Sequence, residues 1–191
     1  MVNESALNDS PTVLDCLRQA TGPSHQRLDA SFGSLILTDQ TDYARFLAAH
    51  FIGLVPLAPL VHDFAARELD FAAPNMLSML RRDLAELGVT VETLPRVDVE
   101  GDLEALGVSY VVAGSRLGLA TIRKQDYWGR SQGLANRYME DELGLALWRA
   151  MVAWFRGHSP SAGDIDRQCR SAIAAFDLFG RAFAISERLT A

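Results

Sequence analysis

Hydrophobic positions recur at helical spacing along most of the chain, and the first such segment also carries polar residues. At alternating spacings of three and four, six residues fall on one stripe of a predicted helix: Leu14, Arg18, Thr21, His25, Leu28 and Phe32. Ser10 followed by Pro11 predicts the start of this helix, because serine caps helices and proline is tolerated in the first turn. Three polar residues therefore lie on a stripe where a helical bundle usually has leucine or isoleucine.

Gly22 and Pro23 interrupt this helix just before His25. Proline inside a helix costs about 3 kcal/mol, because it lacks an N–H and clashes with the carbonyl four residues earlier. The sequence leaves two possibilities open. The helix restarts at Thr21, which is a good N-cap, or it continues through a tolerated kink.

The remaining chain is also predicted to be helical, with Gly88 ending one helix as a C-cap residue. Further helices are expected at 42–55, 59–71, 75–88 and 103–124, one or two within 134–158, and a last one after residues 159–164 that carries Ile173, Phe176, Phe179 and Phe183. Within 42–55, the residues expected to face inward are Tyr43, Phe46, Leu47, His50 and Phe51. Residues 89–102 and 125–133 are expected to be loops. The pattern predicts an all-α fold of about seven to nine helices.

Composition narrows the class of protein. With 191 residues, of which 49% are hydrophobic, the chain suits a single domain over residues 11–191 after a flexible N-terminus at 1–10. A net charge of −6 argues against a sequence-blind nucleic-acid binder. The N-terminus lacks a signal-peptide pattern, and the longest apolar stretch is broken by His50 and two prolines. A soluble cytoplasmic protein is expected, with no membrane partner.

His25 is the first candidate for chemistry. A neutral histidine is a common ligand of iron or zinc, and Asp29, one turn later, can orient its other ring nitrogen. Arg18 lies two turns before His25, about 10 Å along the same face, where it could pair with a ligand carboxylate. The alternative is a hydrogen-bonded core histidine and an unrelated surface arginine.

Gly114 and Gly118 form a second candidate, one turn apart on the predicted helix 103–124. Each glycine costs about 1 kcal/mol relative to alanine inside a helix, so the pair needs a reason. Bare backbone could allow a flat ligand to come close. The alternative is close helix–helix packing, which uses the same spacing.

The other candidate residues and motifs give weaker evidence for a function. His50 and His62 have no carboxylate completing a metal triad and are expected to be core or surface histidines, and His158 is expected to be exposed. The acidic run 140–142 is expected to be a solvated face or a helix start. Phosphate-binding, esterase and zinc-protease motifs are absent from the sequence. Cys16 and Cys169 do not form a disulfide or zinc-site pattern.

Taken together, the two candidates resemble the motifs of one family. The segment "LRQATGPSHQRLD" followed by "LGVSYVVAGSRLGLATI" is similar to the bacterial heme oxygenases, particularly those that accompany bacteriophytochromes. Weaker similarity extends to "AIAAFDLFGRAF" near the end of the chain. The resemblance implies a single-domain multi-helix bundle, with heme b between a proximal N-terminal helix and a glycine-containing distal helix.

The resemblance also implies roles for individual residues. His25 matches the proximal ligand of heme iron, and Asp29 matches its carboxylate neighbour. Gly114 and Gly118, with Ser115 between them, match the catalytic distal helix, whose backbone lies against the face where oxygen binds. Arg18 matches a basic residue near the heme propionates. Tyr110 lies in the distal motif and Arg156 in a looser match; both are expected to contact the cofactor.

The implied reaction opens heme, which is both cofactor and substrate, to biliverdin, carbon monoxide and ferrous iron. It uses O2 and electrons from an external donor such as a ferredoxin or a flavodoxin reductase system, which could dock near Arg123 and Lys124. A bacteriophytochrome is a possible acceptor of the biliverdin. No nucleic acid takes part.

The sequence departs from the family pattern at three positions. Leu119 replaces a glycine, Ala113 replaces a glutamate found in many bacterial members, and Ser115 stands where some members have an aspartate. These changes bear more on turnover than on heme binding. Two alternatives therefore stay open: a non-catalytic heme- or bilin-binding protein on the same fold, and a cofactor-free helical interaction domain.

Overall fold

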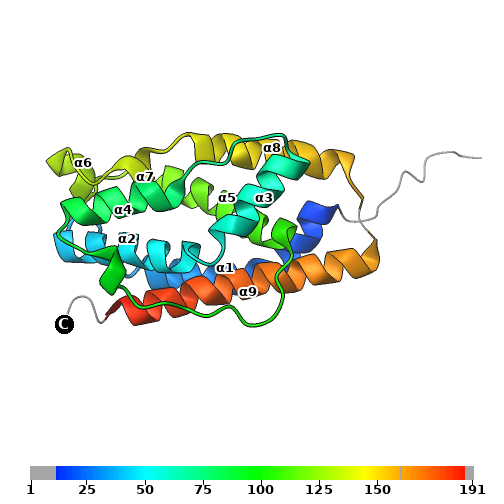
Figure 1. Cartoon of the computed structure of the whole chain (residues 1–191), viewed down its shortest axis with the longest axis horizontal. Helices are drawn as coiled ribbons and strands as arrows, with labels where there is room; N and C mark the ends of the chain where they lie inside the picture. The colour runs from blue at the N-terminus through cyan, green and yellow to red at the C-terminus, as the bar shows by residue number, and fades with distance from the viewer. Residues whose placement is uncertain (1–11, 160, 188–191) are drawn as a thin grey trace, which may run out of the picture.

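The computed structural model describes residues 12–159 and 161–187, and in these residues every regular element is a helix (Figure 1). The elements are α1 (Val13–Phe32), α2 (Gln40–Leu54), α3 (Ala58–Glu68), α4 (Met76–Glu86), the short 3-10 helix η1 (Val91–Thr93), α5 (Ala105–Ile122), α6 (Trp128–Gln132), α7 (Arg137–Glu140), α8 (Leu143–Gly157) and α9 (Ala162–Ser186). One cluster of buried side chains connects α1 through α9. The all-α prediction is confirmed, and the expected flexible segment 1–10 lies outside the described residues.

Helix α1 is continuous through Pro23, so of the two possibilities that the sequence left open, the restart at Thr21 is excluded. The Thr21 hydroxyl donates to the carbonyl oxygen of Leu17 at 2.7 Å, as it does inside a helix. Proline removes the hydrogen bond to the carbonyl of Gln19, a residue that is exposed to water. Thr12 and Asp15 form a capping box at the start of the helix, whereas the start predicted at Ser10 and Pro11 lies outside the described residues. The alternative of a tolerated proline therefore describes α1.

Helix α9 holds the bundle together by packing against α1, α2 and α5. It begins at the same end of the molecule as α1 and runs beside it in the same direction (Figure 1). Two ring contacts fix this parallel register, His25 with Phe176 at 5.5 Å and Phe32 with Phe183 at 4.9 Å between centroids. Both contacts involve residues of the predicted stripe of α1, namely His25 and Phe32.

The connections mostly follow the predictions. Residues 89–102 form no regular element beyond η1, and Gly88, with φ of 77°, adopts the left-handed conformation expected after a helix end. Residues 125–133 are an exception, since they contain the short helix α6 where a loop was expected. A five-residue helix is too short to show a hydrophobic period in the sequence.

Helix α5 is the most apolar long helix and runs through the core. By length and composition it could cross a membrane, and the bent pair α2–α3 passes the same test if it is taken as one span. Over half of α5 is buried inside the protein, where it packs against α3, α8 and α9. Its apolar sequence is therefore accounted for by its place in the bundle, as in the core helix of a soluble protein.

Candidate functional site

A cavity of about 630 Å³ lies along α1 and α5, within the size range of small-molecule sites. Its apolar wall includes Phe32, Phe46, Val111, Leu119, Ile122, Trp148, Phe176 and Phe179. Its polar residues include Arg18, Thr21, His25, Asp29, His50, Tyr110 and Ser115. The structure thus brings the two sequence candidates, ninety residues apart in round figures, to one cavity.

His25 reaches the cavity from α1 and is held by Asp29. Its Nδ1 lies 2.8 Å from the carboxylate oxygen Oδ2 of Asp29, one turn later on the same helix. More than half of the His25 side chain is exposed, which excludes the alternative of a buried core histidine. A carboxylate that holds the proton on Nδ1 leaves the Nε2 lone pair free to bind a metal.

If His25 binds a metal, it would do so as a single protein ligand. Among the described residues, no group of three or more His, Cys, Asp or Glu side chains is placed to hold a metal ion. A site for a bare metal ion needs several such ligands. A metal that arrives with its own macrocycle needs only one protein ligand, and His25, oriented by Asp29, could serve as that ligand.

Gly114 and Gly118 reach the cavity from α5, and neither is required for helix packing. A Cβ atom added to Gly118 would meet nothing within 4 Å, and one added to Gly114 would make only ordinary contact with the Trp148 ring. In contrast, a Cβ on Gly107 of the same helix would lie 2.2 Å from the backbone oxygen of Gln168 in α9. The missing side chains at 114 and 118 therefore widen the cavity.

The other predicted site residues divide into two groups. Arg18, Tyr110 and Ser115 line the cavity; Tyr110 packs on Trp148, and the Ser115 hydroxyl donates to the carbonyl oxygen of Val112 at 2.7 Å. Arg156 is not among the cavity residues. Trp148 is the α8 residue that reaches the cavity, and Arg156 lies eight residues further, about 12 Å along the helix. The expectation that Arg156 contacts the cofactor is therefore not met by the structure.

His50 is a cavity residue that the sequence interpretation set aside. Its side chain is 8% exposed, and its ring lies among Phe32, Phe46, Phe179 and Tyr138. Burial lowers the pKa of His50 to about 4; the hydrogen bond to Phe46 opposes this shift, and the charge of Arg116 adds to it. His50 is therefore neutral at neutral pH. The sequence feature that could have identified His50 as a cavity residue is its position among the inward-facing residues of α2.

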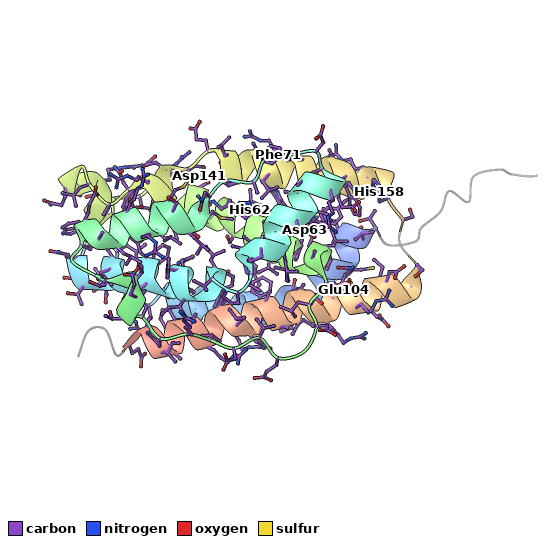
Figure 2. The ribbon with its side chains drawn as sticks, viewed as in Figure 1. His62, Asp63, Phe71, Glu104, Asp141 and His158 are labelled. Atoms are coloured by element: carbon purple, nitrogen blue, oxygen red, sulfur yellow. The ribbon has the colours of Figure 1, made fainter. Side chains whose placement is uncertain are left out.

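A buried ion pair fixes the position of α5. Arg116, 2% exposed, donates to Asp141 at 3.1 Å and to the carbonyl oxygen of Tyr138 at 2.7 Å. Asp141 also accepts the backbone N–H groups of Leu143 and Gly144 at the start of α8. In Figure 2, Asp141 and His158 mark the two ends of α8. Asp141 and Glu142 thus stand at a helix start, as one of the two interpretations of the run 140–142 expected, whereas Glu140 ends α7 and the Asp141 side chain is buried.

Comparisons with known proteins do not identify a family for this chain. No protein-family model matches the chain, and no curated protein matches it with significant similarity.

The glycine geometry predicts opposite effects of two matched substitutions in α5. Gly118→Ala should raise the free energy of unfolding by up to about 1 kcal/mol, since alanine favours the helix and meets open space. Gly107→Ala should lower it by about 1–3 kcal/mol, because its Cβ would press against the backbone of α9. Urea unfolding measures both values. Destabilisation by Gly118→Ala would show that its space is needed for packing.

The buried His50 predicts a pH dependence of stability. Its folded pKa of about 4 lies below the unfolded value of 6.5, so the unfolded chain binds the extra proton between these values. Stability is fully present above about pH 6.5 and declines toward pH 4, by at most about 3 kcal/mol from this group. Because carboxylates also titrate near pH 4, the measurement is the difference in unfolding free energy between wild type and His50→Leu across this window. A difference independent of pH would contradict the prediction.

Proposed function

We propose that the protein binds heme in this cavity and opens the heme ring to biliverdin, carbon monoxide and ferrous iron. The observation that carries the proposal is the shared cavity: the His25–Asp29 pair lines it from α1, and the unpacked glycines 114 and 118 line it from α5. The resemblance of both segments to heme oxygenase motifs supports the same function. A soluble cytoplasmic location accords with it.

The residues of the cavity fit a heme. Its apolar walls suit a flat hydrophobic ring, and Nε2 of His25 suits ferrous or ferric iron. Arg18 lines the cavity and is exposed, so its guanidinium is available to a propionate of the ligand. When bound, heme supplies both the iron that activates oxygen and the ring that is oxidised.

The protein's own part in this reaction is to orient and enclose. Asp29 holds the proton on Nδ1 of His25, which keeps Nε2 available as a neutral ligand. The bare backbone at Gly114 and Gly118 allows the ring to approach α5 closely. The Ser115 hydroxyl donates its hydrogen bond to the carbonyl of Val112. In this conformation it can therefore only accept a hydrogen bond from a ligand in the cavity.

Electrons must come from outside the protein. We propose a small acidic ferredoxin or a flavodoxin reductase system as donor, and a bacteriophytochrome as one acceptor of the product. Lys124 is the stronger candidate for docking the donor, because Arg123 already lies 3.6 Å from a carboxylate oxygen of Glu140.

A second candidate function is binding of heme or a bilin without turnover. It is favoured by Leu119, which is 4% exposed and fills cavity wall where the family has glycine. Asp29 is the sole carboxylate residue among the described cavity residues, so no second acid lines the wall formed by α5. The third reading, a cofactor-free interaction domain, predicts that hemin does not bind at all.

Turnover distinguishes these functions. The protein is mixed with one equivalent of hemin, and ascorbate or a ferredoxin system is added in air. We expect loss of the heme absorption with matching amounts of biliverdin, identified by chromatography, and carbon monoxide. A stable heme complex that yields neither product would contradict the catalytic proposal and leave the binding function.

Substitutions at the proximal pair test the assignment of the ligand. His25→Ala should abolish turnover and change the ferric heme spectrum, and Asp29→Ala should lower hemin affinity or activity by about 10- to 100-fold. His62→Ala is the matched control, since His62 is an exposed histidine on α3 and does not line the cavity (Figure 2). Circular dichroism checks that each variant folds. Equal spectra for His25→Ala and wild type would show that His25 is not the ligand.

A further inference from the structure

His50 lies at an aromatic end of the cavity. Its ring centroid is 4.7 Å from that of Phe32 and 4.3 Å from that of Phe46, and both phenylalanines line the cavity. Phe179, another cavity residue, lies 6.1 Å away. The proposed axial ligand, His25, is on a different helix, and none of the ring contacts of His50 involves it. His50 therefore needs an explanation other than iron binding by the His25–Asp29 pair.

One ring nitrogen of His50 is committed and the other is free. Nδ1 lies 2.8 Å from the carbonyl oxygen of Phe46, and a carbonyl can only accept, so Nδ1 carries the proton. In the neutral ring the lone pair is then on Nε2. Nε2 has no hydrogen-bond partner among the described residues, and it is not among their fully enclosed unpaired atoms. His50 lines the cavity, so an Nε2 atom that is not fully enclosed can face a ligand bound there.

A neutral acceptor in an apolar wall selects for a ligand that brings a donor. Leaving such an acceptor unpaired beside a bound ligand costs free energy, because water that could satisfy it has been displaced. The ring of heme offers no N–H donor, since its four nitrogens bind iron and most of its edge is hydrocarbon. A metal-free linear tetrapyrrole differs in one respect that matters here, because its pyrrole and lactam N–H groups are free to donate.

We propose that Nε2 of His50 accepts a hydrogen bond from an N–H group of a linear tetrapyrrole, which makes the cavity a bilin-binding site with His50 as its specificity-determining residue. The proposal deepens the proposed function, because it uses the same cavity and the product of the same reaction. It gives the cavity two recognition elements, His25 for iron and His50 for the iron-free ring.

Parallel titrations with biliverdin and hemin test this proposal on wild type, His50→Leu and His50→Gln. Loss of one neutral hydrogen bond should weaken biliverdin binding about tenfold in His50→Leu. His50→Gln retains an acceptor oxygen and should recover part of the affinity. Hemin affinity should change less than about threefold in both variants, because hemin has no donor for this position.

A measurement on the wild-type protein covers the case in which a variant does not fold. The 15N chemical shift of His50 Nε2 should move when biliverdin binds and stay nearly constant when diamagnetic gallium protoporphyrin binds. The proposal is overturned if biliverdin does not bind, if His50→Leu weakens both ligands equally, or if the nitrogen shift is the same with both ligands. Hemin binding and turnover in wild type decide the proposed function separately, so the two can fail independently.

Discussion

The packing of α1 along α9 is the constraint on which the cavity depends. Phe176 and Phe183 of α9 contact His25 and Phe32 of α1, while α9 also packs against α2 and α5. One long helix thereby sets the position of both cavity walls. Apolar burial over this contact stabilises the bundle without covering the polar stripe of α1, so a helix with arginine, threonine and histidine on one face is tolerated in a small helical protein.

Helix α5, which forms the opposite wall of the cavity, also combines apolar burial with polar residues. Its apolar residues are buried against α3, α8 and α9, and the Arg116–Asp141 ion pair joins it to the start of α8. A buried pair of this kind contributes little net stability, but removing one partner leaves an uncompensated charge, so it fixes the helix in one position. Gly114 and Gly118 lie on either side of Arg116 in the sequence. The helix is thus held rigidly where it opens toward the cavity.

Much of this could be predicted from the sequence, and the exceptions have physical causes. Period and spacing predicted the helices and placed His25 and the two glycines as candidates, because a helix face follows directly from residue spacing. The sequence left open whether α1 restarts at Thr21 or continues through Pro23, and the structure shows that it continues. The surroundings of His50 and Arg116 could not be predicted. Each is a polar residue among apolar neighbours in its helix, and only the tertiary structure shows what lies around it. Arg156 shows the converse, where a loose sequence match did not lead to the cavity.

The central claim is that this cavity binds heme with His25 on the iron, and a crystal structure of the protein with hemin tests it most directly. The account predicts the ring between α1 and α5, Nε2 of His25 bonded to iron, Nδ1 on Asp29, and the backbone of Gly114 and Gly118 against the other face. Iron bonded to a different residue, or hemin bound outside the cavity, would contradict it.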